Sequence, residues 1–215
     1  LDVAKAMGLD DRIGSKFLRA GPGYGGSCFP KDMMALSRTG QKVHTPLNIV
    51  EAVIKTNSKR QHEMVDKIVK ACDGDLEGKT IGVLGISFKP NTDDIRGASS
   101  LVIIPELQKR GAKIKAYDPA AIEHAKPYLN DVAWEDNAYS VAEDADALVL
   151  LTEWNQFKAL KLQIIGELMK VKRLIDLRNV YGVDEMEKLG FHYVSVGRPE
   201  IRPRELHVIK DASNQ

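Results

Sequence analysis

A cysteine, a lysine and an aspartate stand together at the end of a glycine-rich stretch, Gly21-Pro-Gly-Tyr-Gly-Gly-Ser-Cys-Phe-Pro-Lys-Asp32. An apolar-periodic run follows and closes at Gly40, so we expect a loop that leads into a short helix. Pro30 suits the first helical position, because its missing N–H would have no partner there. Cys28 would then lie just ahead of the first turn, and Asp32 would lie within it, where the helix dipole favours a carboxylate.

The position expected for Cys28 favours a reactive thiolate, since backbone N–H groups would point towards it and Lys31 stands nearby. The alternative is that Cys28 is a small buried hydrophobic residue, as isolated cysteines commonly are. Cysteine hydrolases need a histidine base, and none of the five histidines is spaced to supply one. A thiol without such a base suits addition to an aldehyde better than attack on an amide.

Helical segments are predicted on the N-terminal side of the loop, over residues 1–20. They carry Arg12 and Arg19, which are seven residues apart and share a helical face. Planar guanidinium groups are good partners for phosphate. The alternative is that both are solvated surface charges.

A long helix is predicted from 47 to 72, behind Thr45 and Pro46, which form an N-cap and first-turn pair. At about 1.5 Å per residue it would be nearly 40 Å long, so we expect it to pack against something large.

The glycines of 21–26 formally match G-x-G-x-x-G. A dinucleotide-binding fingerprint needs a strand before it, whereas a helical pattern precedes this stretch. We therefore interpret the glycines as allowing a ligand close to the backbone. Gly25 is the residue expected to contact the substrate.

Strand patterns alternate with helical ones after a polar hinge at 73–78. The predicted strands cover 79–85, 113–118, 147–151, 173–176 and 191–194. The predicted fold class is therefore α/β, with a helical region and its long helix followed by a Rossmann-like, doubly wound parallel sheet.

Three basic residues, Lys89, Arg96 and Arg178, follow the carboxyl ends of predicted strands, where such sheets bind ligands. Asp118 ends a strand as a ribose-binding acid would, although a strand-end cap is the preferred interpretation. Trp134 and Trp154 are interpreted as packing residues.

Composition indicates an ordinary soluble protein of 215 residues, 43% of them hydrophobic. Thirty-one basic and thirty acidic residues nearly cancel, which gives no reason to expect nucleic acid or membrane partners. Cys28 and Cys72 make no disulfide framework, so a reducing cytoplasm is the expected location. The chain opens on Leu1 within an amphipathic pattern, which is typical of a fragment.

Three motifs now point to one family. The run Tyr24-Gly-Gly-Ser-Cys-Phe-Pro-Lys-Asp32 closely resembles the active-site signature of the UDP-glucose/GDP-mannose dehydrogenase family, most of all its UDP-glucose-oxidising branch. The run Gly85-Ile-Ser-Phe-Lys-Pro-Asn-Thr-Asp-Asp-Ile-Arg96 and the run Asp176-Leu-Arg-Asn179 resemble two further signatures in the expected order. The resemblance extends from the first residue to about residue 195.

The resemblance implies a central helical domain at 1–73, which carries the cysteine loop and the long helix. It also implies a UDP-sugar-binding α/β domain at 74–200, and we expect a loosely ordered tail at 201–215. The long helix at 47–72 would form a homodimer interface. The family's N-terminal Rossmann domain, which holds NAD, would be absent from this chain.

The resemblance also implies a reaction, the NAD-dependent four-electron oxidation of UDP-glucose to UDP-glucuronate. Cys28 would add to the aldehyde intermediate and carry it as a thiohemiacetal and then a thioester, and Asp32 would assist the water that cleaves the thioester. Lys31 and Arg96 would contact NAD, and no metal is expected. The substrate contacts would be Arg12, Phe17, Leu18, Arg19, Ala20, Gly21, Gly25, Lys89 and Arg178.

Two alternatives remain open. The chain could be a non-catalytic module for nucleotide-sugar binding and dimerisation, and the fragment itself is expected to be inactive without the NAD domain. It could also belong to a dehydrogenase of GDP-mannose or of a UDP-N-acetyl sugar.

Overall fold

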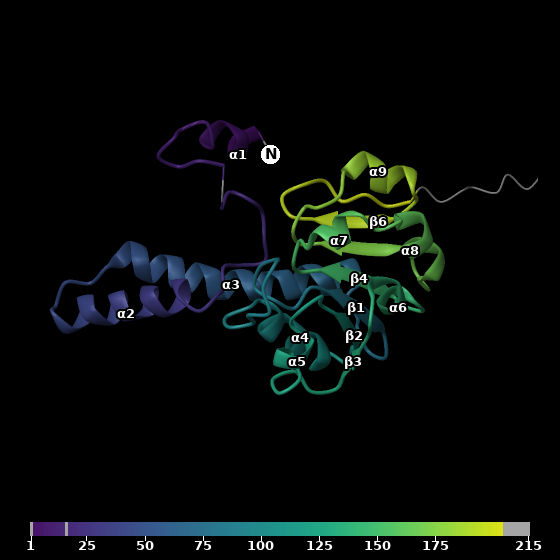
Figure 1. Ribbon diagram of the computed structural model, residues 1–215, viewed down its shortest axis with the longest axis horizontal. Coiled ribbons are helices and arrows are strands. Elements are labelled where there is room, and N and C mark those ends of the chain that lie inside the picture. Colours follow the sequence, from purple (N-terminus) through teal and green to yellow (C-terminus); the bar gives the residue numbers. More distant parts are fainter. Residues whose placement is uncertain (1, 16, 204–215) are drawn as a thin grey trace, which may run out of the picture.

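A helical arm projects from an α/β body in the computed structural model (Figure 1). The structure describes residues 2–15 and 17–203. Most of the loose tail predicted at 201–215 therefore lies outside the described residues.

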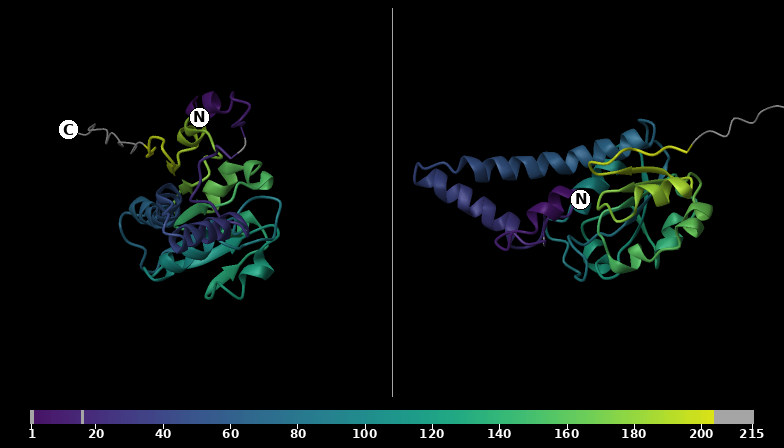
Figure 2. Two further views of the ribbon diagram at one scale, coloured as in Figure 1. Left: turned by 90° about the vertical axis from the view of Figure 1, so that its left-hand side faces the viewer. Right: turned by 90° about the horizontal axis from the view of Figure 1, so that it is seen from above.

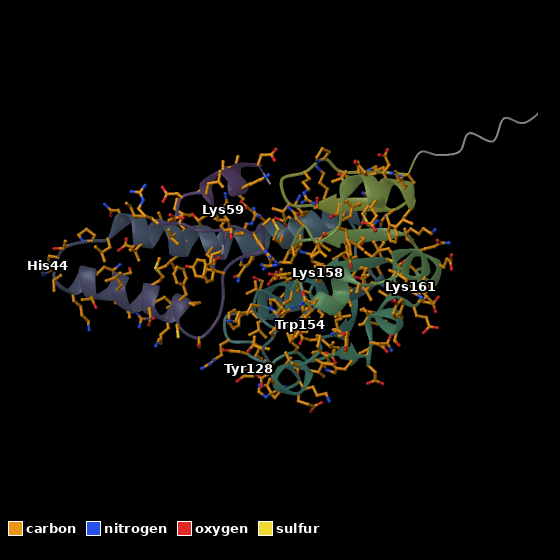
Figure 3. All side chains as sticks on the ribbon, turned by 45° about the horizontal axis from the view of Figure 1, so that its top comes forward. His44, Lys59, Tyr128, Trp154, Lys158 and Lys161 are labelled. Atoms are coloured by element: carbon orange, nitrogen blue, oxygen red, sulfur yellow. The ribbon has the colours of Figure 1, made fainter. Side chains whose placement is uncertain are left out.

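The arm is an antiparallel pair of helices, α2 (Phe29–Lys42) and α3 (Asn48–Ala71), which Figure 2 shows from above. His44 lies at its tip (Figure 3). Gly40 does not end α2 as predicted, because the helix continues for two more residues. A Cβ at Gly40 would lie 2.7 Å from the Thr45 carbonyl oxygen, so the glycine instead allows the turn before α3 to pack closely on α2.

The long helix predicted at 47–72 is confirmed as α3, with 24 residues, but its predicted N-cap is wrong. Leu47 occupies the N-cap position. The Thr45 hydroxyl instead donates a hydrogen bond to the Val43 carbonyl at 3.4 Å, within the turn that joins the two helices.

The helical prediction for residues 1–20 holds only for α1 (Asp2–Met7). Beyond it the described chain turns, and Gly14 has a φ of 69°. The Asp10 carboxylate accepts hydrogen bonds from the backbone N–H and the guanidinium of Arg12. Such local bonds offer the backbone an alternative to a helix.

Within the described residues, six parallel strands form one sheet in the order β3-β2-β1-β4-β5-β6, which is the order of a doubly wound Rossmann sheet. The predicted fold class is confirmed. The strands are β1 (Thr80–Leu84), β2 (Lys113–Tyr117), β3 (Val132–Trp134), β4 (Ala147–Leu150), β5 (Arg173–Asp176) and β6 (His192–Ser195). The sequence prediction missed β3, because this edge strand has only three residues and none of them is fully buried.

Alternate strand residues pack into two apolar cores, one on each face of the sheet. On one face Val149 and Ile175 pack with α3 and α4 (Ser100–Gln108). On the other face Leu148 and Leu174 pack with α6 (Ala138–Ala142), α8 (Leu162–Leu168) and α9 (Val183–Lys188). Two further short helices are α5 (Ile122–Ala125) and α7 (Asn155–Lys158).

Helix α3 belongs to both the arm and the body. Its C-terminal half contributes Met64, Val65 and Ile68 to the core of the sheet, while its N-terminal half pairs with α2. One continuous helix therefore fixes the position of the loop before α2 relative to the sheet. The domain boundary near residue 73 stays a prediction. None of the described helices combines the length and the apolar character that a membrane crossing requires.

Candidate active site

The glycine-rich loop lies against the carboxyl end of the sheet. The Gly26 N–H donates to the Arg96 carbonyl at 2.7 Å, and the loop after β1 carries Arg96. The guanidinium of Arg60, on α3, donates to the Gly21 carbonyl from two nitrogens at 3.4 Å. A described turn rather than a strand precedes the loop, which agrees with the rejection of a dinucleotide fingerprint.

Cys28 occupies the N-cap position of α2, directly ahead of the first turn. Its side chain is exposed, so the interpretation of Cys28 as a buried hydrophobic residue is wrong; the buried cysteine is Cys72. The Ser27 hydroxyl lies 3.6 Å from the Cys28 sulfur. One turn on, the Lys31 ammonium and the Asp32 carboxylate lie 3.3 Å apart, and both are exposed.

An open groove of about 440 Å³ adjoins this turn. Pro30, Met34 and Ala35 give it an apolar floor, and Lys31, Arg38 and Arg96 bring three cationic side chains to it. The Arg96 guanidinium is oriented by the Asp94 carboxylate, with nitrogen–oxygen distances of 3.0 and 2.9 Å. Sequence reasoning missed Arg38, although its place seven residues after Lys31 on a helix was a usable signal.

Arg178 follows β5, and its Nη2 donates to Oε1 of Glu153 at 2.6 Å. The Glu153 side chain is buried, at 9% exposure, and the Arg178 side chain is half-buried, at 15%. Burial raises the pKa of Glu153, but the hydrogen bond and charge of Arg178, with a smaller effect from Arg19, hold that pKa below its usual range. Glu153 is therefore an anion at neutral pH. Glu153 follows the carboxyl end of β4 in the same way that Arg178 follows the carboxyl end of β5. This position marks Glu153 as a candidate site residue, but the sequence prediction did not include it.

The predicted contacts Gly21, Gly25 and Lys89 come together around the loop. A Cβ on Gly21 would overlap Nη1 of Arg178, and a Cβ on Gly25 would overlap the Gly97 carbonyl. The Lys89 ammonium lies 5.4 Å from the centroid of the Phe88 ring. The same ring would lie 2.9 Å from a Cβ on Gly26. The backbone thus approaches its neighbours as closely as glycine allows.

The remaining predicted residues lie on the N-terminal side of this cluster. Arg12 pairs with Asp10, and its side chain is 89% exposed. Phe17 is fully exposed, with a φ of 64°, while Leu18 and Ala20 are half-buried and Arg19 is exposed. The expected contact of Arg12 with the substrate stays a prediction.

Asp118 is a buried cap at the end of β2. Its carboxylate accepts hydrogen bonds from the backbone N–H groups of Ile86, Ser87, Ala120 and Ala121. The indole of Trp154, labelled in Figure 3, donates to it at 3.2 Å. Because these bonds occupy both oxygens, Asp118 has a structural role rather than that of a ribose ligand.

The fold and the site together define a Rossmann-like α/β protein in which a helical arm carries an exposed cysteine to the carboxyl end of the sheet. The chain belongs to the UDP-glucose/GDP-mannose dehydrogenase family. The family's central domain matches residues 1–59, and its UDP binding domain matches residues 82–183.

Individual relatives are similar over most of this chain. It is 48% identical over 199 residues to UDP-glucose 6-dehydrogenase of Rhizobium meliloti, which covers 93% of this chain and 46% of the relative. A solved UDP-glucose dehydrogenase from Pyrobaculum islandicum has a TM-score of 0.77 and 32% identity, over 91% of this chain and 42% of that one.

A solved NDP-N-acetyl-D-galactosaminuronic acid dehydrogenase from Methanosarcina mazei has a TM-score of 0.78 and 26% identity, over 92% of this chain and 43% of that one. The chain thus spans about half the length of the relatives that it matches.

Proposed function

We propose that this chain is the central and C-terminal part of an NAD-dependent UDP-glucose 6-dehydrogenase, which oxidises UDP-glucose to UDP-glucuronate. The observation that carries this proposal is the docking of the cysteine loop on the carboxyl end of the sheet. The loop bonds to Arg96 and packs on Arg178, so a ligand bound along the crevice would present its sugar to Cys28. The 48% identity to a protein of that name supports the choice of substrate.

The site supplies a nucleophile for an aldehyde. The Cys28 sulfur adds to the carbonyl carbon of C6, so that a C–S bond forms, the carbonyl π bond breaks and a proton reaches the oxygen. The resulting thiohemiacetal carbon carries a hydrogen that can leave as hydride, and loss of that hydride together with the hydroxyl proton restores the carbonyl as a thioester. Asp32, in the same helical turn, would help to activate the water that cleaves this thioester.

The groove beside Cys28 has the chemistry to contact part of a dinucleotide. Three cationic side chains, Lys31, Arg38 and Arg96, suit a pyrophosphate, and the apolar floor suits a flat ring. NAD, when bound there, would accept the hydride in each of the two oxidation steps.

The nucleotide sugar would be held from both sides of the loop. Lys89 and Arg178 offer cations from the sheet side, Gly21 and Gly25 offer close approach to the backbone, and the segment 17–20 together with Arg12 would complete the site. Within the described residues, no cluster of three or more histidine, cysteine or acidic side chains is arranged to hold a metal ion.

Alkylation of Cys28 tests this function on the chain itself. Iodoacetamide should modify Cys28 and leave the fully buried Cys72 unmodified. UDP-glucose should slow the modification of Cys28. A non-catalytic binding module would bind the ligand without protecting the thiol, and the absence of both binding and protection would overturn the proposal.

A dehydrogenase of a UDP-N-acetyl sugar is the second candidate, because the Methanosarcina mazei structure is as similar in fold as the UDP-glucose enzyme. Titration calorimetry of UDP-glucose against UDP-N-acetylglucosamine and GDP-mannose separates these candidates. Selective binding of UDP-glucose is the expected result.

We also propose that a second copy of this chain covers the exposed apolar side of the arm. The exposed apolar side chains of the arm outside the groove are Leu36, Val43, Ile49 and Val53, and exposed apolar patches commonly mark interfaces. The two unpaired cysteines support a reducing compartment, the cytoplasm.

A further inference from the structure

The backbone of the cysteine loop at Tyr24 pairs with a side chain of the long helix. The Tyr24 N–H donates to Oδ1 of Asn57 at 2.8 Å, and Nδ2 of Asn57 donates to the Tyr24 carbonyl at 3.1 Å. One amide therefore satisfies both polar groups of one loop residue, as a neighbouring strand would. Among the described residues, no main-chain group forms a hydrogen bond with the N–H or the carbonyl of Tyr24.

The ring of Tyr24 extends this contact to the cysteine. It meets the ring of Phe29 edge to face, with centroids 4.9 Å apart and an angle of 88°. Phe29 is the first residue of α2 and follows Cys28 directly. A continuous chain of contacts thus runs from Asn57 through Tyr24 to Phe29, which directly follows Cys28 in the sequence.

The surroundings of Asn57 fix the loop to the body of the protein. One turn further along α3, Gln61 is buried, and its amide lies 3.4 Å from the Ser99 hydroxyl. Gly23 lies between these groups, and a Cβ there would be 3.0 Å from Oδ1 of Asn57. Because the next turns of α3 belong to the core of the sheet, the bonds of Asn57 fix the loop relative to the sheet.

We propose that Asn57 is a positioning residue, which holds the Tyr24 peptide so that Cys28 meets an aldehyde bound on the sheet. This inference rests on the proposed function and adds a residue to it. An aspartate at position 57 would be similar in size but would lack the donor, and it would place a carboxylate against the Tyr24 carbonyl. Asn57→Asp therefore replaces one of the two hydrogen bonds with a repulsion between oxygens, with little change in volume.

The chain offers a matched control for this substitution. Asn179 forms the same paired contact with Val196, at 2.9 Å in both directions, on a loop that follows β6. Asn179→Asp should lower the midpoint of thermal unfolding to a similar degree, without touching Tyr24. Any effect of Asn57→Asp on the thiol that Asn179→Asp lacks reports on the position of the loop rather than on stability.

Formation of the thiohemiacetal measures that position directly. The chain is saturated with the C6 aldehyde of UDP-glucose, labelled with ¹³C at C6, and the fraction bonded to Cys28 is read by NMR. No oxidant is needed, since the thiol adds across the carbonyl. We expect Asn57→Asp to lower the adduct about tenfold or more, because small misplacements of a reacting group are costly. At saturating aldehyde, Asn179→Asp should stay within about twofold, because Asn179 pairs with Val196 and not with the cysteine loop.

The affinity for UDP separates positioning from binding. The matched UDP binding domain begins after the loop, at residue 82, so Asn57→Asp should leave the dissociation constant of UDP within about twofold. An adduct fraction that does not change in Asn57→Asp would overturn the inference. Equal losses of adduct in both variants would overturn it as well, because they would show an effect of stability alone.

Failure of the proposed function would give a different result. The unsubstituted chain would then bind neither UDP nor the aldehyde, and hydrogen exchange of the Tyr24 amide would test the inference alone. Exchange should become faster in Asn57→Leu, which removes the acceptor. Unchanged exchange would show that Asn57 does not hold the loop.

Discussion

Arg178 and Glu153 join two loops at the carboxyl end of the sheet through a partly buried ion pair, with Nη2 and Oε1 2.6 Å apart. Glu153→Gln removes the anion and leaves the Arg178 cation partly buried. Since an unpaired buried charge is costly, we expect a loss of about 1–3 kcal/mol in the free energy of unfolding, measured with urea. The double substitution Glu153→Leu with Arg178→Met should recover most of this loss. A Glu153→Gln variant with the same free energy of unfolding as wild type would show that the ion pair contributes nothing to stability.

The same pair predicts how stability depends on pH. Despite burial, which raises it, the pKa of Glu153 in the folded protein lies below the usual 4.5, because Arg178 favours the anion. A carboxyl group of this kind stabilises the folded state above its unfolded-state pKa, and the contribution is lost as pH falls through the lower folded-state value. The difference in unfolding free energy between wild type and Glu153→Gln should thus be full near neutral pH and shrink below pH 4.5. A constant difference across that range would contradict this assignment.

The sequence predicted the five strands of four or five residues and missed the three-residue strand β3. Strands β4 and β5 are short runs of fully buried residues, which stand out between helical patterns. Strand β3 has three partly exposed residues, and the edge position that makes this possible depends on its pairing with β2. Local patterns do not contain that information.

The candidate site was predictable where its residues are neighbours in sequence. Cys28, Lys31 and Asp32 stand within one helical turn, so their spacing alone placed them. Asn57 and Glu153 were not predicted, because their partners lie 33 and 25 residues away. A polar residue that interrupts an apolar stripe looks the same whether it holds a loop or faces solvent.

The close packing of Gly25 on the loop after β1 predicts a steric effect. A Cβ at this position would overlap the carbonyl oxygen of Gly97, which is backbone and cannot rotate away. Gly25→Ala should therefore cost about 1–3 kcal/mol of unfolding free energy, as overpacking does. It should also weaken UDP-glucose binding in titration calorimetry, since the loop must shift.

Gly182 supplies the control for this experiment. Its nearest neighbour to an added Cβ is 3.9 Å away, and its φ of −76° suits any residue. Gly182→Ala should leave both stability and UDP-glucose affinity close to wild type. A Gly25→Ala variant as stable as Gly182→Ala would mean that the loop does not pack on Gly97 in solution.

The exposed apolar side of the arm predicts a dimer that one charge can weaken. Ile49 is 82% exposed, so Ile49→Asp should cost the single chain little stability. In a dimer built on the arm, the same substitution would bury a carboxylate. We expect the dissociation constant to rise about tenfold or more, since the cost of an unpaired buried charge exceeds about 1.4 kcal/mol. Sedimentation velocity across a concentration series measures this dissociation constant.

Ile164→Asp, at a 40% exposed position on α8, is the control and should leave the dimer unchanged. A wild-type chain that stays monomeric, or a dimer weakened only by Ile164→Asp, would place the interface elsewhere than on the arm.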